Sequence, residues 1–524
     1  MSQDISPPEK IADRVEIAHP DLKRRASAGV ATLLARRAIV QVLSIIATSI
    51  LMRLLSVEQF GLYAIASFVV IIGGYFADAG LGAALIQRKE EVSQDDINVV
   101  FTVQSVLLVI ITIAIFLVAP WLQQQYALPE YSVWLIRVLG LTLFLSSLRL
   151  VPIVMLERRL EYQKLSIADV SGLLAFQVTA VLLAFAGMGA WSFVLAALFQ
   201  AAVVAIVLYI LCPWRPRYTL QLRRARALLR FGGLVQARTF MVVIKDNITP
   251  ALIAAVGGPV AVGYVGFAQK LSSYPLVIEE ATSRVSFPTY SRIQDDLPRL
   301  QRAIEKSLKL VNLLLFPFIM LLIVLAEPLV RLVLGTQWLP ALPAFYLFAL
   351  ANLTAGMSNV LVSSLFALGR PGVVIRLSTF WAVATWALAL PLVIFYGWIG
   401  LPIATFLLAG TVALPVWEIR KIIPVRVLDA VLKPGIISLL AAGAAAASRL
   451  VLDGTIAGLL GSAIIGGVVY IVGIFLVDGR WLATELMTAL PPKMYHRLAK
   501  APFIGAFATA ASNYVPVDPG PQPR

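Results

Sequence analysis

Three basic residues and a carboxylate interrupt an otherwise apolar part of the chain. The cations are Arg238, Lys245 and Lys270, and Lys245 is followed directly by Asp246 and Asn247. Arg238 and Lys245 are seven residues apart, which is two turns of an α-helix, so they share one helix face. Each cation can donate charge-assisted hydrogen bonds to a phosphate oxygen. The pattern predicts that Arg238, Lys245, Asn247 and Lys270 line a cavity for a phosphate-bearing ligand.

Two acids are candidates for ion coupling. A carboxylate in the middle of a membrane-spanning helix costs at least about 2.5 kcal/mol on insertion scales, so it faces a cavity or a partner. Asp246 either responds to an ion gradient or pairs with a neighbouring cation and only neutralises it. Asp78 is the second candidate, and it lies in the glycine-rich stretch 73–82, where neighbouring helices can approach closely.

A polar stripe occupies one face of the first apolar stretch. Arg37, Gln41, Ser44 and Thr48 follow one another at intervals of four, three and four residues. The stripe predicts a cavity-lining face, and the alternative is hydrogen bonding between helices, which Ser, Thr and Gln often provide in membranes. Arg53, at the far end, either guides an anionic headgroup or anchors the helix.

Arg137 and Arg149 lie on a single apolar stretch. They are twelve residues apart and therefore about 120° apart around a helix. We expect Arg137 to extend toward the membrane surface and Arg149 to line the cavity. A structural role for both is the alternative.

Apolar stretches of membrane-spanning length position all of these residues. The chain of 524 residues is 60% hydrophobic and 14% charged, and about 20 apolar helical residues cross a bilayer. The sequence therefore predicts an all-α polytopic membrane protein with about 14 transmembrane helices. The predicted spans are 29–52, 61–86, 97–119, 132–155, 166–187, 190–211, 231–256, 261–283, 305–326, 341–368, 372–396, 399–418, 430–452 and 456–477.

The basic residues between the spans set the predicted orientation. Almost all of them fall on one side, including the cluster in 215–230, whereas the opposite links carry only Arg53, Arg331 and Arg449. Cytoplasmic links are the ones enriched in Lys and Arg, so both termini are predicted to be cytoplasmic. No cleavable signal peptide is expected. The net charge of +15 indicates topology and contact with membrane lipids rather than a nucleic-acid partner.

The residue inventory excludes several chemistries. Cys212 is the single cysteine, and the two histidines, His19 and His496, lie in the terminal tails. No intrachain disulfide can form, and we expect no metal site and no cofactor beyond a coupling H⁺ or Na⁺ gradient. The absence of a Gly-Lys dipeptide excludes a P-loop ATPase.

A weak internal repeat divides the chain. Segment 33–41 recurs at 228–236, and Phe-Gly-Leu-Tyr-Ala at 60–64 is echoed by Val-Gly-Tyr-Val-Gly at 262–266. Six spans separate the copies, so two parallel six-helix bundles would surround a central cavity. Chance similarity among apolar helices is the alternative. The predicted parts are a cytoplasmic tail (1–28), a bundle (29–211), a basic linker (212–230), a second bundle (231–418), a helix pair (430–477) and a cytoplasmic tail (478–524).

Several of these motifs resemble those of one transporter superfamily. The stretches 60–64 and 78–89, the run Lys245-Asp246-Asn247, Gly263-Tyr264, and Lys270-Leu271 with Pro275 carry the likeness, which covers about residues 30–425. The chain resembles bacterial polysaccharide flippases of the multidrug/oligosaccharidyl-lipid/polysaccharide exporter superfamily, in the branch of colanic-acid and succinoglycan exporters.

This resemblance implies movement of a polyprenyl-pyrophosphate-linked oligosaccharide from the cytoplasmic to the periplasmic leaflet of the bacterial inner membrane by alternating access. The implied partners are the lipid-linked oligosaccharide, membrane lipids and other polysaccharide-assembly proteins. The sequence departs from that of a typical ion-coupled antiporter in one respect, because it has few acidic residues within the predicted spans.

Two other functions remain open. A drug or cation antiporter of the same superfamily would need an acidic cavity, whereas the residues at membrane depth lean basic. A membrane-embedded polysaccharide polymerase or glycosyltransferase would need positioned acids or bases, yet the chain has no Asp-x-Asp pair and no large loop. The sequence therefore favours a transporter over an enzyme.

Overall fold

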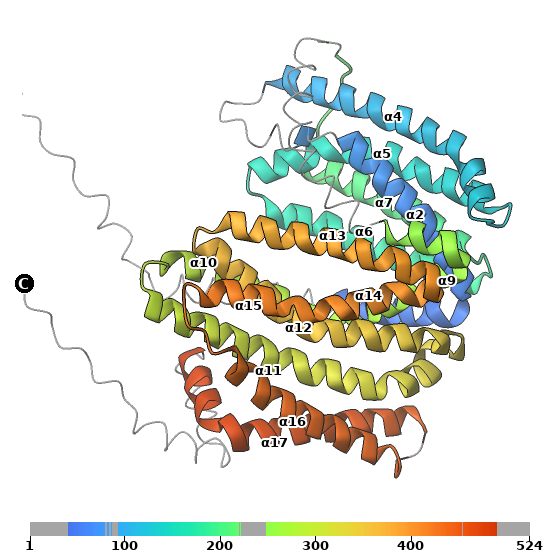
Figure 1. Ribbon diagram of the computed structural model, residues 1–524. Coiled ribbons are helices and arrows are strands. Elements are labelled where there is room, and N and C mark those ends of the chain that lie inside the picture. Colours follow the sequence, from blue (N-terminus) through green and yellow to red (C-terminus); the bar gives the residue numbers. More distant parts are fainter. Residues whose placement is uncertain are drawn as a thin grey trace, which may run out of the picture. The chain divides into compact units, whose positions relative to one another are not determined.

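A computed structural model describes residues 40–78, 81–82, 85, 93–219, 221, 248–452 and 454–489, and every regular element in them is helical (Figure 1). A helix Val40–Leu54 comes first. The long helices that follow are α2 (Val57–Asp78), α4 (Gln94–Gln125), α5 (Ser132–Arg158), α6 (Tyr162–Phe185), α7 (Trp191–Leu211), α9 (Thr249–Ser273), α10 (Val277–Arg292), α11 (Leu297–Leu329), α12 (Leu342–Ala367), α13 (Pro371–Tyr396), α14 (Gly400–Ala409), α15 (Ala413–Arg420), α16 (Val427–Ser448) and α17 (Ile456–Ala489). Short turns are η2 (Tyr274–Leu276), η3 (Val330–Leu334), η4 (Thr336–Ala341), η5 (Gly397–Ile399) and η6 (Gly410–Val412). The predicted all-α fold is confirmed.

Eleven helices in the described part of the chain are long and apolar enough to cross a membrane. The protein is a multi-pass membrane protein. The difference from the predicted fourteen spans arises in three places. One is the first helix, whose described residues, Val40–Leu54, are too few to count. The other two are places where a pair of predicted spans forms one continuous helical stretch, Thr249–Glu279 and Pro371–Arg420.

Gly258 separates the first of these pairs. Its φ of 65° and ψ of −168° break α9, and Pro259 follows it. Thr249 before the break and Gln269 after it line the same pocket, although a straight helix would place them about 30 Å apart. The chain therefore turns back on itself at Gly258, at the link that the sequence predicted between two spans.

Gly397 separates the second pair in the same way. Its φ is 64° and its ψ is −152°, and it ends α13. The 50 residues of Pro371–Arg420 would form a straight helix about 75 Å long, more than twice the thickness of a bilayer core. Instead α13 and α14 pack against each other, as two antiparallel crossings must.

Contacts divide the chain into two compact units. Unit 1 comprises Met1–Leu54, Phe76–Ile113 and Arg137–Gln236, and unit 2 comprises Leu55–Tyr75, Ala114–Ile136 and Ala237–Arg524. The predicted division into bundles 29–211 and 231–418 stays a prediction.

Unit 1 has its core around α6 and α7. Gly172 of α6 lets the two helices meet closely, because a Cβ there would overlap a methyl group of Val204. The basic linker begins on this unit: Trp214 stacks edge-on against Phe101 with ring centroids 5.2 Å apart. The backbone N–H of Thr219 donates a hydrogen bond of 2.9 Å to the Thr102 hydroxyl.

In unit 2, α11 lies between α12 on one side and the helix pair α16 and α17 on the other (Figure 1). Asn312 in α11 is fully buried and donates a hydrogen bond of 3.1 Å to the Ala430 carbonyl in α16. Tyr470 in α17 donates through its hydroxyl to the Leu313 carbonyl. The predicted extra helix pair therefore packs on α11.

Candidate functional site

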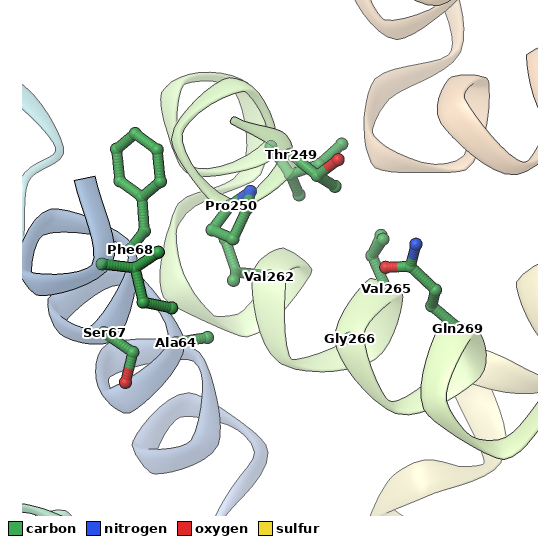
Figure 2. A pocket seen from close by; sticks show the side chains of 11 residues that line it. Ala64, Ser67, Phe68, Thr249, Pro250, Val262, Val265, Gly266 and Gln269 are labelled. Atoms are coloured by element: carbon green, nitrogen blue, oxygen red, sulfur yellow. The ribbon is translucent and has the colours of Figure 1, made fainter. Parts of the chain in front are cut away.

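A pocket of about 240 Å³ lies where α2 meets both arms of the bent α9 (Figure 2). Its lining is mostly apolar, and it carries no charged side chain. The lining residues are Ala64, Ser67, Phe68 and Ile71 from α2, and Thr249, Pro250, Ile253, Val262, Val265, Gly266 and Gln269 from α9. Such a site suits an uncharged, largely apolar chain, with the few polar groups fixing its orientation.

Two glycines bring α2 and α9 together in a reciprocal manner. A Cβ on Gly61 of α2 would overlap the backbone carbonyl of Pro259, and a Cβ on Gly263 of α9 would overlap the backbone carbonyl of Val57. Gly61 and Gly263 occupy the same position in the two copies of the predicted repeat, and so do Val57 and Pro259. Each glycine therefore meets the counterpart of the residue that the other glycine meets. Such exchanged contacts are expected when two segments are related by a twofold axis.

An aromatic side chain from η4 supports this junction. Trp338 is fully buried, its ring 5.1 Å from that of Phe60 in α2 and 4.8 Å from that of Phe267 in α9. The side chain of Gln337 donates a hydrogen bond of 3.0 Å to the Leu55 carbonyl. Buried aromatic packing therefore joins α2, α9 and η4 at this junction.

A capping box starts α2 beside the pocket. The Gln59 backbone N–H donates to the Ser56 hydroxyl over 3.3 Å, and the Ser56 N–H donates to Gln59 Oε1 over 3.0 Å. This reciprocal arrangement satisfies two donors that a helix start leaves without partners.

Lys270 is the one predicted cavity residue that the described part of unit 2 contains. It follows Gln269 on α9, is solvent-accessible, and has no ion-pair partner among the described residues. Arg238, Lys245, Asp246 and Asn247 lie outside the described residues. In the sequence this polar run ends two residues before Thr249, which lines the pocket. Their roles stay predictions.

The other predicted site residues belong to unit 1. Gln41 and Arg53 are both exposed on the helix Val40–Leu54. Arg149 in α5 is half-buried, and its Nε is buried without a hydrogen-bond partner among the described residues. The carboxylate of Asp169 in α6 interacts electrostatically with the Arg149 guanidinium. Arg37 and the side chain of Asp78 lie outside what the structure describes.

Sequence reasoning missed the wall that α9 contributes to the pocket. Val262, Val265, Gly266 and Gln269 follow at helical spacing on one face of α9. That spacing was readable, but an apolar face on a membrane helix looks the same whether it packs on protein, lipid or a ligand. Only the position of α2 makes it a pocket wall.

Comparison with known proteins decides the family. The model of the polysaccharide biosynthesis protein family matches residues 50–343, which is more than half of the chain. The chain belongs to this family. The resemblance inferred from the motifs is therefore confirmed. The match includes α2, the bent α9 and Trp338, so this family member carries the pocket within the shared region.

Curated relatives agree with this family. The chain is 29% identical over 345 residues to the succinoglycan biosynthesis transport protein ExoT of Rhizobium meliloti (strain 1021), covering 66% of this chain and 69% of the relative. It is 24% identical over 346 residues to the lipopolysaccharide biosynthesis protein WzxC of Escherichia coli (strain K12), covering 64% and 69%.

Two solved structures share the fold of this family member. The lipid II flippase MurJ in an inward closed conformation matches with a TM-score of 0.70 and 15% identity, over 85% of this chain and 98% of that chain. An inward-facing multidrug resistance MATE family transporter of the MOP superfamily matches with a TM-score of 0.54 and 17% identity, over 73% and 94%. At these identities the likeness establishes the fold.

Proposed function

We propose that this protein is a flippase that moves a polyprenyl-pyrophosphate-linked oligosaccharide from the cytoplasmic to the periplasmic leaflet of a bacterial inner membrane. Membership of the polysaccharide biosynthesis protein family carries the proposal. The names of its relatives, a succinoglycan transport protein and a lipopolysaccharide biosynthesis protein, support a role in making surface polysaccharide.

The chemistry of the α2–α9 pocket fits such a substrate. A lipid-linked oligosaccharide joins an apolar chain to a pyrophosphate and a polar sugar. The pocket offers apolar walls and the Gln269 amide. Lys270, the next residue on α9, is exposed but does not line the pocket, and we propose that its cation lies near the anionic part of the substrate. A cation in that position favours an anionic ligand and disfavours the cationic drugs that the alternative antiporter would carry.

Transport rather than catalysis is part of the proposal. The pocket lining has neither an acid nor a base that could exchange a proton with a reacting bond. Alternating access, coupled to an H⁺ or Na⁺ gradient through Asp246 or Asp78, is proposed from the sequence. An Asp246→Asn variant whose export depends on the gradient as the wild type does would remove Asp246 from this role.

The decisive experiment compares membranes of a strain lacking this gene with those of its parent. We expect completed polyprenyl-linked oligosaccharide to accumulate and surface polymer to fall, because the lipid carrier stays loaded on the inner leaflet. Mass spectrometry of the extracted lipids would then identify the sugar. Normal surface polymer without accumulation would refute the flippase and favour the drug antiporter.

Complementation of that strain tests Lys270. We expect Lys270→Ala to reduce export about tenfold or more at normal protein level, because hydrogen bonds to charged groups contribute about 1.5–3 kcal/mol. Lys270→Arg keeps the charge and should retain most export. Arg376→Ala is the matched control, since Arg376 is an exposed cation on another helix, α13, and does not line the pocket. Equal export by all three variants would contradict a role for Lys270.

A further inference from the structure

A second cavity, of about 560 Å³, opens between α11, α16 and α17, on the side that the sequence assigns to the cytoplasm. It lies in unit 2 and shares no lining residue with the pocket of α2 and α9. Its lining is Arg302, Glu305, Lys306, Lys309, Arg426, Asp429, Ala430, Lys433 and Trp481. Five cations therefore face two carboxylates.

One of those carboxylates is already engaged by uncharged groups. Glu305 Oε1 accepts a hydrogen bond of 2.8 Å from the Arg426 backbone N–H and another of 3.0 Å from the Gln301 side chain. The Gln301 amide also donates to the Pro424 carbonyl, over 2.9 Å. Glu305 thus ties the loop before α16 to α11 through backbone and amide groups.

Two lysines that line the cavity, Lys309 and Lys433, share one carboxylate. Asp478 in α17 is only 9% exposed, 3.1 Å from Lys309 Nζ and 3.3 Å from Lys433 Nζ. Lys309 also lies over the ring of Trp481, 4.2 Å from its centroid. A kink at Asp478, with φ of −131° and ψ of 21°, places the carboxylate there. Because one carboxylate is shared by two ammonium groups, this cluster keeps a net positive charge.

An apolar groove of about 370 Å³ follows along the same two helices, α11 and α17, one to two turns beyond Lys309 and Trp481. It is lined by Leu313, Leu314, Pro317, Phe318, Leu321, Gly467, Tyr470, Ile471, Ile474 and Phe475. The Tyr470 hydroxyl is bonded to the Leu313 carbonyl, so it does not face the groove as a free polar group. A basic cavity and an apolar groove thus follow one another along α11 and α17.

We propose that this basic cavity and groove bind an anionic phospholipid of the surrounding bilayer, with the phosphate in the cavity and an acyl chain along α11 and α17. Basic pockets between transmembrane helices on the cytoplasmic side are suited to anionic headgroups. The groove distinguishes this ligand from a soluble phosphate, which has no chain to place there. The site is separate from the proposed transport pocket and would bind lipid whether or not the protein is a flippase.

Native mass spectrometry of the purified full chain tests the site. The probes are phosphatidylglycerol, phosphatidylethanolamine with the same chains, and inorganic phosphate. We expect phosphatidylglycerol to bind several-fold more tightly than phosphatidylethanolamine. The double variant Lys306→Gln/Arg426→Gln should weaken phosphatidylglycerol binding about thirtyfold, because each cation near a lipid surface contributes about 1 kcal/mol and about 1.4 kcal/mol is a factor of ten in affinity. The control Arg370→Gln/Arg376→Gln removes two exposed cations, one directly before α13 and one in its second turn, and should change phosphatidylglycerol binding less than about twofold.

A variant of the groove separates phospholipid from free phosphate. Gly467 lines the groove, and a Cβ there would meet no atom within 4 Å. Gly467→Phe should therefore fill the groove without moving the helices or the cations. Binding of phosphatidylglycerol should weaken several-fold. Phosphatidylglycerol binding unchanged in both the Gln double variant and Gly467→Phe would overturn the proposal. So would binding of inorganic phosphate alone.

Discussion

Gly61 and Gly263 show what single residues contribute to this fold. Their positions in matching motifs were readable from the sequence, and the repeat predicted from them places them at equivalent points. Their partners were not readable, because Pro259 and Val57 lie about two hundred residues away along the chain. A glycine on an apolar helix has many reasons to be there, and only the packed structure shows which backbone it admits.

Gly61→Ala should destabilise the protein, because the added methyl group meets a backbone carbonyl that cannot move independently of its helix. Overpacking of this kind costs about 1–3 kcal/mol. The measurement is the thermal midpoint of the purified protein, followed by fluorescence-detected size exclusion. Gly266→Ala is the matched control, since a Cβ there meets nothing within 4 Å, and removing a helical glycine should slightly stabilise α9. Equal midpoints for the two variants would contradict the close approach.

Helices were predicted well and their ends less well. Spans such as 132–155 and 190–211 match α5 and α7 closely, because membrane burial selects about 20 consecutive apolar residues. The breaks at Gly258 and Gly397 fall at predicted links. In contrast, α17 continues past the predicted end at 477 to Ala489. Hydropathy falls at Asp478, but Lys309 and Lys433 compensate its charge there, and a sequence does not show which helices supply them.

Asp478→Asn tests how firmly α17 is held. The change leaves two neighbouring ammonium groups, one largely buried and one about half exposed, without their shared anion. Breaking a buried ion pair is strongly destabilising, and with partial exposure we expect a loss of about 1–3 kcal/mol. The same thermal assay measures it. Asp478→Asn/Lys433→Gln removes one of the uncompensated charges and should recover part of the loss; no recovery would argue against charge as the cause.

The molecule as a whole is predicted to keep both termini in the cytoplasm. Cys212 makes this testable without a cysteine-free background, because the side chain is only 2% exposed and burial raises the pKa of its thiol. A raised pKa means less thiolate near neutral pH, and the thiolate is the reactive form. Cys212 should therefore stay unlabelled by a maleimide in the native protein.

Added cysteines then report the side of each link. Met188→Cys, in the exposed turn between α6 and α7, should react with a membrane-impermeant maleimide in cells whose outer membrane is permeable and whose inner membrane is intact. Arg370→Cys, at the start of α13, should react only after the inner membrane is opened. The reverse pattern would invert the topology and with it the predicted direction of transport.

If the predicted repeat arose by duplication, the reciprocal packing at Gly61 and Gly263 also limits how its two copies can diverge. After duplication, each copy normally accumulates substitutions without regard to the other. Here Gly61 faces the Pro259 carbonyl, and Gly263, its counterpart in the other copy, faces the Val57 carbonyl. A larger residue at either glycine would push apart the same two helices, so both copies face one common constraint. Homologues should therefore keep a small residue at both positions even where the rest of the repeat is no longer recognisable.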